Sequence, residues 1–173
     1  MNRFLTFIVT LSLFHFKALA ANSLDVEFRG ILINTSCQIA SESVNQKIIL
    51  NNLRWQFINE NTFSVITPFS IAIDKCSDTD IKKSVKLTWE SNQLVNIEGV
   101  YYLSTKGSSG VFIGILDKEG KPIIWNKPMT VGEISVAENK QQFDFGVLVR
   151  KPFSEDVNVG DFSGTVTFSV EYE

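Results

Sequence analysis

Strict alternation of apolar and polar residues near the C-terminal end constrains the fold of this chain more than any other feature. From position 162 to 172, every second residue is apolar or glycine, and most of the residues between them are polar. Because the side chains of a β-strand point alternately to its two faces, the pattern predicts a strand with one buried face. The chain has no convincing helical periodicity over a helical length, so we predict an all-β fold. The apolar face consists of Phe162, Gly164, Val166, Phe168, Val170 and Tyr172.

Shorter segments of the same kind occur along the chain. Turn-forming residues separate them, and Asp117 to Gly120 predicts a hairpin leading into residues 123–125. Short strands with turn signals roughly every ten residues are typical of an immunoglobulin-like sandwich. The expected strands are residues 24–32, 69–73, 85–89, 100–103, 111–116 and 143–149, and residues 47–50 form a short apolar run.

The first twenty residues have the composition of a secretory signal peptide. A basic start at Arg3 is followed by an apolar run from Phe4 to Phe14 and by the small-x-small cleavage signal that ends at Ala20. The apolar run is too short to cross about 30 Å of hydrocarbon as a helix. We therefore expect residues 1–20 to be removed and the remainder to be exported as one soluble domain.

Cleavage at this point would remove His15, the only histidine. Without imidazole, the exported chain cannot use Ser-His-Asp or Cys-His nucleophile activation, histidine acid–base catalysis or a histidine metal site. The net charge of −3 becomes more negative when Arg3 and Lys17 are lost, which argues against nucleic acid or an anionic membrane as the main partner. We expect no enzyme activity, no cofactor and no metal.

The two cysteines, Cys37 and Cys76, are an isolated pair in a chain expected to be exported. Such a pair predicts a disulfide, because the compartments outside the cytoplasm are oxidising. Closing a loop of about 40 residues stabilises a fold by roughly 4 kcal/mol in the chain-entropy treatment.

Other residues that could carry chemistry have simpler interpretations. The acidic groups at Asp78 and Asp80, at Asp117 and Glu119, and at Glu155 and Asp156 lie in predicted turns, where solvated charge is the ordinary reading. Ser108 and Ser109 lack the Gly-x-Ser-x-Gly spacing of a nucleophile elbow. An aromatic set could stack on sugar rings, but packing in the core is the better interpretation; this set is Trp55, Trp89, Trp125, Tyr101 and Tyr102.

Both ends of the exported chain carry an apolar face that must be covered, either by neighbouring strands of the same sandwich or by a partner's strand. They also carry a family resemblance. Residues 26–37, which end in Asn34-Thr35-Ser36-Cys37, resemble the N-terminal extension and first cysteine of chaperone-usher pilus subunits, the P-pilus and type 1 group of Gram-negative bacteria. Residues 160–173 are similar to the closing strand of that family, including its penultimate tyrosine. The apolar alternation that leads into Cys76 is similar to the second-cysteine strand.

The resemblance implies an immunoglobulin-like sandwich that lacks its last strand. In that family a periplasmic chaperone first lends the missing strand, and at the outer-membrane usher the N-terminal extension of the next subunit replaces it, a process called donor-strand exchange. It implies three regions here: a signal peptide (1–20), a donor-strand extension (21–36) and a pilin domain (37–173). The implied partners are the chaperone, the usher and neighbouring pilus subunits, among them a tip adhesin.

The resemblance also assigns roles to residues. Gly30 matches the glycine of the family's donor strand, where a Cβ would crowd the groove. On the acceptor side, the apolar row from Phe162 to Tyr172, with Gly164 within it, lines the groove or pairs with the chaperone's strand, and the carboxylate of Glu173 is bound by basic chaperone residues. The expected donor residues are Leu24, Val26, Phe28, Gly30 and Leu32.

The predicted function is therefore a structural pilus subunit that is exported to the cell surface and supports adhesion. A composition that favours Phe, Ile, Asn and Lys over Ala, Gly and Thr favours a minor or adaptor subunit. Two alternatives stay open at this point: a chain-terminating subunit of the same family, and a stand-alone secreted ligand-binding β-sandwich with a complete fold.

Overall fold

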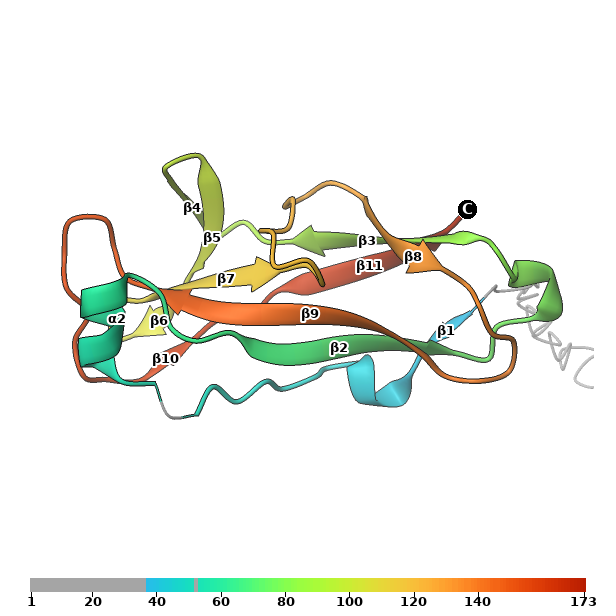
Figure 1. The fold of residues 1–173 in the computed structure, drawn as a ribbon, viewed down its shortest axis with the longest axis horizontal. Helices are drawn as coiled ribbons and strands as arrows, with labels where there is room; N and C mark the ends of the chain where they lie inside the picture. The colour runs from blue at the N-terminus through green and yellow to red at the C-terminus, as the bar shows by residue number, and fades with distance from the viewer. Residues whose placement is uncertain (1–36, 52) are drawn as a thin grey trace, which may run out of the picture. The chain divides into compact units, whose positions relative to one another are not determined.

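The computed structural model describes residues 37–51 and 53–173, which all belong to one compact unit. The signal peptide and the donor-strand residues Leu24, Val26, Phe28, Gly30 and Leu32 lie outside the described residues. Almost all regular structure in the described part is β-strand (Figure 1). The helical exceptions are α2 (Trp55–Asn61) and two short 3-10 turns, η1 (Ser41–Ser43) and η2 (Asp78–Asp80).

The larger sheet has six strands in the order β1-β2-β9-β7-β5-β4, all antiparallel. Strand β9 is long and central, and it pairs with β2 on one side and with β7 on the other. At the far edge β4 and β5 form a hairpin whose two-residue turn, Glu98 and Gly99, has positive φ angles, as tight hairpins require. The strands are β1 (Gln38–Ile39), β2 (Thr67–Asp74), β4 (Leu94–Ile97), β5 (Val100–Ser104), β7 (Phe112–Leu116) and β9 (Gln141–Arg150).

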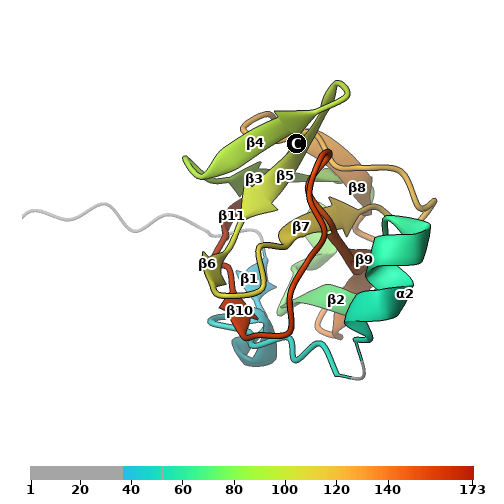
Figure 2. The same cartoon turned by 90° about the vertical axis from the view of Figure 1, so that its left-hand side faces the viewer.

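A three-stranded sheet in the order β11-β3-β8 lies over the larger sheet, as both Figure 1 and the end view in Figure 2 show. Before β11, the C-terminal part of the chain pairs through β10 with β6 in a two-stranded ribbon. These strands are β3 (Ser84–Glu90), β6 (Lys106–Gly107), β8 (Met129–Glu133), β10 (Phe162–Ser163) and β11 (Thr167–Tyr172).

The core lies between the two sheets and is formed by the inward side chains of both. Ile71 and Ile73 on β2, Val85 and Leu87 on β3, and Phe145 on β9 are all nearly inaccessible to solvent. Burial of side chains of this size stabilises the fold by about 1.5–3 kcal/mol each. The all-β sandwich predicted from the sequence is confirmed.

Local features of the fold differ from the sequence prediction. Strands β4 and β8 were not predicted. Helix α2 was not predicted, since its seven residues are too few to show helical periodicity. The expected strand at residues 123–125 is reduced to an isolated bridge between Trp89 and Trp125. The C-terminal strand is interrupted at residues 164–166, where the chain leaves β6 and begins to pair with β3.

Candidate functional site

A groove of about 620 Å³ runs between two extended segments, residues 46–50 and residues 160–166. Its floor consists of apolar side chains that belong to the core of the sandwich. Both sheets contribute to this floor, so the groove opens directly onto the interface between them. The floor residues are Phe69, Trp89, Leu103, Ile113, Ile115 and Val147.

One rim of the groove is the C-terminal segment. Phe162, Gly164 and Val166 line the groove. The row then continues along β11, whose residues alternate between half-buried and exposed. Val166, Phe168, Val170 and Tyr172 pack against the core from this side. Within the described residues β11 pairs with β3 alone, so its other edge offers backbone N–H and C=O groups to a further strand.

The opposite rim is the segment that follows β1. The backbone N–H of Ala40 still donates to the carbonyl of Ala72 over 2.9 Å, beside β2. Farther on, residues 46–50 make no backbone pairing with any other described segment. Ile48 and Ile49 are 36% and 62% exposed although both line the groove. The groove therefore has apolar side chains on both rims, with unpaired backbone at residues 46–50 on this side.

Gly164 lies where the C-terminal rim changes its pairing partner from β6 to β3. A Cβ atom at this position would lie 2.6 Å from Cδ2 of Leu103 and 3.0 Å from Cδ1 of Ile113. A Cβ this close would require the side chain of Leu103 to shift, so glycine gives the backbone its close approach to these floor residues. The chain dips toward the floor here between its two pairing partners, β6 and β3.

Helix α2 supports one end of the groove. Ile58 of α2 packs with Val149 and Val157 in a second apolar cluster, and the groove residues Leu50 and Phe162 pack against this cluster. The side chain of Asn59 ties α2 to the segment before β10: its Nδ2 donates to the carbonyl of Val157 over 3.2 Å, and its Oδ1 accepts from the N–H of Val157 over 2.8 Å.

A tight crossing of two backbones also fixes this end. The N–H groups of Ser108 and Ser109 donate to the carbonyl of Asp161 over 3.1 and 3.3 Å. Gly107 has a φ of +121°, and a Cβ there would lie 2.2 Å from the same carbonyl oxygen. Ser108 and Ser109 thus anchor the start of the rim instead of forming a catalytic loop.

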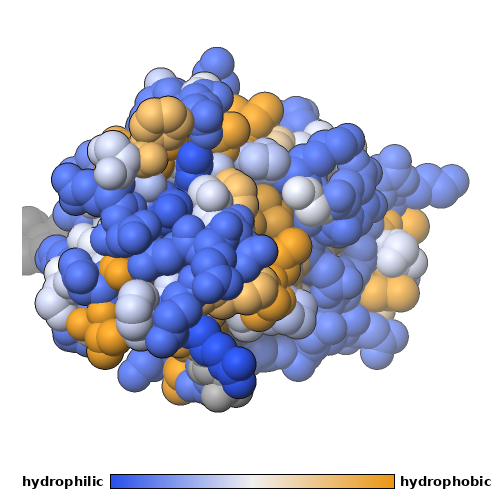
Figure 3. Space-filling model, turned by 60° about the vertical axis from the view of Figure 1, so that its left-hand side comes forward, coloured by the Kyte–Doolittle hydropathy of each residue, from blue (hydrophilic) through white to orange (hydrophobic). Residues whose placement is uncertain are grey.

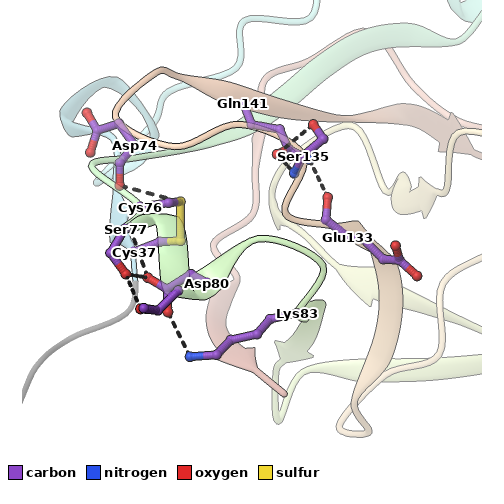
Figure 4. Close-up of a disulfide and its surroundings, with 10 residues drawn as sticks. Cys37, Asp74, Cys76, Ser77, Asp80, Lys83, Glu133, Ser135 and Gln141 are labelled. Carbon is purple, nitrogen blue, oxygen red and sulfur yellow. Dashed lines mark hydrogen bonds and ion pairs between the residues drawn. A yellow bond between two sulfur atoms is a disulfide. The ribbon is translucent and has the colours of Figure 1, made fainter.

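The disulfide between Cys37 and Cys76 lies at the other end of the groove-bearing strands, as predicted (Figure 4). Next to it, Ser77 and Asp80 form a reciprocal capping box, and Asp80 also accepts from Nζ of Lys83 over 2.7 Å. Asp80 is only 2% exposed. The expectation of a solvated turn charge was wrong for this residue, because its carboxylate closes the turn that begins after Cys76.

Tyr172 and Glu173 end the rim near the disulfide. Burial of Tyr172, with smaller effects of Asp80 and Asp74, raises the pKa of its hydroxyl to about 12. The backbone N–H and carbonyl of Glu173 pair with Ser84, and its side chain forms an ion pair with Lys86. The predicted interaction of Glu173 with a chaperone remains a prediction.

The described residues offer little for other chemistry. Trp89, Trp125 and Tyr102 are buried, and Trp55 and Tyr101 lie on different elements, α2 and β5, so the aromatic set forms no common platform for a sugar. Between residues 37 and 173, Asn52 aside, no cluster of His, Cys, Asp or Glu could hold a metal ion. In the same part of the chain, no helix has both the length and the apolar character of a membrane span.

Sequence reasoning singled out residues on one rim, whose role as an acceptor stays a prediction, and it missed the other rim. Phe162, Gly164 and Val166 line the groove, whereas Phe168, Val170 and Tyr172 share their inward face without lining it. The run at residues 47–50 was visible as apolar, but nothing in the sequence placed it opposite residues 160–166. Only the sheet topology brings these two segments to the same opening.

Comparisons with known proteins agree with this geometry. The family model described as "Fimbrial protein" matches residues 26–173. The chain is 27% identical over 150 residues to the PRS fimbrial major pilin protein of Escherichia coli, covering 86% of this chain and 93% of that protein. It is also 27% identical over 170 residues to the fimbrial adapter PapK of E. coli, covering 91% and 94%. The crystal structure of the P pilus rod subunit PapA superposes with a TM-score of 0.64 at 20% identity, covering 80% of this chain and 100% of PapA.

Proposed function

The chain belongs to the fimbrial protein family, and from this membership we propose that it is a subunit whose groove accepts a donor strand from its neighbour in the fibre. Proteins of this family are structural subunits of pili that are exported to the cell surface. A stand-alone secreted sandwich, the alternative from another class, is therefore set aside. The finer statement, that assembly proceeds by donor-strand exchange, is the proposal.

One observation carries this proposal: the core of the sandwich is open along the line where one more strand would fit. Residues 46–50 make no backbone pairing with another described segment and β11 pairs only with β3, and the apolar floor between residues 46–50 and 160–166 contains Trp89 and Leu103. An inserted strand can satisfy the backbone of β11 while its alternate side chains cover the floor. The pairing that this completes is the ordinary edge-to-edge addition of a strand to a sheet.

The donor in this proposal is residues 21–36 of the next subunit, ahead of the pilin domain at 37–173. Its apolar side chains would enter the groove, and Gly30 would lie where a Cβ atom would crowd the groove. Four buried apolar side chains contribute roughly 6–12 kcal/mol at about 1.5–3 kcal/mol each, an upper bound before ordering costs. The four side chains are those of Leu24, Val26, Phe28 and Leu32.

The orientation follows from the existing sheets. Every ladder in the described part of the chain is antiparallel. A donor that continues this pattern runs antiparallel to β11, so it begins near Tyr172 and ends near Phe162. Its last groove residue, Leu32, then lies at the α2 end of the groove.

The proposal extends to the partners and to the place in the fibre. A groove this apolar would aggregate if left open in the periplasm, which supports temporary cover by a periplasmic chaperone before transfer at an outer-membrane usher. We propose a minor or adaptor subunit that supports adhesion. The composition, with 14 Phe against 10 Gly, and the similarity to the adapter PapK support this role.

A substitution in the donor strand tests the mechanism without changing the described domain. In cells that carry only the variant chain, Phe28→Asp should reduce the amount of this subunit in pili sheared from the surface by at least tenfold, because a carboxylate would be buried in the apolar groove. The matched control, Glu27→Gln, changes the neighbouring residue of opposite parity and should leave incorporation unchanged. Immunoblots of sheared pili measure both.

The Phe28→Asp subunit should also still bind a synthetic peptide of residues 21–36, since its own groove is intact. Wild-type incorporation of the Phe28→Asp chain would contradict donor-strand exchange.

A further inference from the structure

We propose that exposed apolar residues beside the α2 end of the groove dock the folded domain of the neighbouring pilin subunit, the one whose strand fills that groove. This surface, here called the end platform, rests on the proposed function and adds a second contact to it. It consists of Trp55, Phe57, Phe153 and Val159.

The platform residues are exposed although they are large and apolar. Trp55 and Phe57 are each 42% exposed, Phe153 is 74% exposed and Val159 is 76% exposed. Isolated exposed apolar residues are common, but several at one end of a domain are typical of an interaction site. Figure 3, which brings the α2 side forward, shows hydrophobic patches that interrupt a largely hydrophilic surface.

Hydrogen bonds and an ion pair join the two parts of the end platform. Helix α2 and the segment that holds Phe153 and Val159 are joined by the two hydrogen bonds between Asn59 and Val157. Nζ of Lys151 adds a bond of 2.8 Å to the carbonyl of Asn59, and it also pairs with Asp156 at 3.1 Å. These contacts hold the two parts of the platform together, so the binding of a partner costs little conformational entropy.

The platform is also continuous with the groove. Val159 directly precedes Gly160, the first groove-lining residue of the C-terminal rim. Beneath Trp55 and Phe57, Ile58 packs in the cluster that includes Leu50 and Phe162, which also line the groove. A strand that leaves the groove at this end therefore emerges beside the platform.

The length of chain between the donor strand and the folded domain determines which part of the neighbouring subunit lies beside the end platform. The donor's last groove residue is Leu32, and its folded domain starts at the disulfide-bonded Cys37. Five residue steps span at most about 17 Å. The domain of the donor subunit must therefore begin within that distance of the α2 end, and the part of it that comes first is the end that carries its own disulfide.

The contact joins unlike surfaces, the α2 end of one subunit and the disulfide end of the next. Such a head-to-tail contact does not close on itself, so it repeats along an open fibre. The end platform would limit the angle between successive subunits, which a connection through residues 33–36 alone would not fix.

Site-specific photo-crosslinking in assembled pili tests this inference. The full-length chain carries p-benzoylphenylalanine at one position at a time, and pili are purified before irradiation. Phe57→p-benzoylphenylalanine reports on the platform, Ile49→p-benzoylphenylalanine on the groove rim, and Ile124→p-benzoylphenylalanine is the control, because Ile124 is 58% exposed but lies on the β7–β8 connection. Phe153→p-benzoylphenylalanine is a second platform position if the first is not incorporated.

We expect position 49 to crosslink to the N-terminal extension of the neighbour and position 57 to crosslink to its folded domain, several-fold more than position 124, as identified by mass spectrometry. Crosslinks from position 49 with none above control from positions 57 and 153 would overturn the platform and leave the proposed function intact. Absence of crosslinks from position 49 would instead count against donor-strand insertion itself.

Discussion

Tyr172 shows how a single side chain at the rim of the groove links burial to pH dependence. Within the described residues its hydroxyl is buried and has no hydrogen-bond partner. Burial is the largest cause of the rise of its pKa from 10.0 to about 12, and Asp80 and Asp74 add to it. The neutral phenol is thus favoured in the folded state more than in the unfolded chain.

The sign of the pH effect follows from this shift. Between about pH 10 and pH 12 the unfolded chain releases the proton of Tyr172 while the folded domain keeps it, so the free energy of unfolding falls as the pH rises. Tyr172→Phe should therefore lose less stability than the wild type over this range. At neutral pH its stability should be unchanged or slightly higher, because a buried unpaired hydroxyl is removed.

Chemical denaturation at pH 7, 10 and 11.5 measures both effects of Tyr172→Phe. A variant whose stability falls as steeply with pH as that of the wild type would show that Tyr172 is not responsible for the loss.

At the same scale, the sequence predicts which residues face inward but not what they face. The parity of Phe162, Val166 and Val170 could be predicted because a strand alternates its side chains strictly. The opposing rim at Ile48 and Ile49 could not be predicted, since a short apolar run has no partner until the sheets assemble.

Among the elements, the strands with the clearest alternation were predicted best. The predicted segments 69–73, 85–89 and 143–149 lie within β2, β3 and β9. The predicted single strand at 162–172 is divided into β10 and β11, because the chain changes its pairing partner from β6 to β3. Helix α2 forms through tertiary packing of Ile58, which local sequence does not reveal.

The clamp between α2 and the C-terminal segment makes a prediction about Asn59. Asn59→Ala removes both hydrogen bonds to Val157 and should lower the free energy of unfolding by about 1–3 kcal/mol, because part-buried backbone groups lose their partner. Asn61→Ala is the matched control on the same helix. It removes one exposed bond, from Nδ2 to the carbonyl of Phe57, and should cost much less.

Urea denaturation of the two chains, each saturated with a peptide of residues 21–36, compares them under the same conditions. Equal losses of stability in Asn59→Ala and Asn61→Ala would contradict a structural role of the clamp at the end of the groove.

For the molecule as a whole, the described residues form a sandwich whose core reaches the surface along one line. The groove between residues 46–50 and 160–166 lies where the edges of the two sheets would otherwise be joined by a further strand. The sequence suggested this through apolar patterns at both ends of the chain. In the fold, the C-terminal segment forms one rim of this groove, and we propose that a neighbour's N-terminal segment fills it.

The most direct test of donor-strand completion supplies the missing strand within the same chain. An antiparallel donor begins where β11 ends, so residues 21–36 can be attached after Glu173 through a short flexible linker. Thermal unfolding and oligomeric state are compared for residues 37–173 alone, for the chain with the attached strand, and for the same chain with Phe28→Asp in the attached strand.

We predict that the attached strand gives a monomer with a markedly higher Tm, while the bare domain and the Phe28→Asp form melt low or aggregate. Three monomers with the same Tm would show that the domain is complete without a donor, and would contradict the proposal that its groove accepts a neighbour's strand.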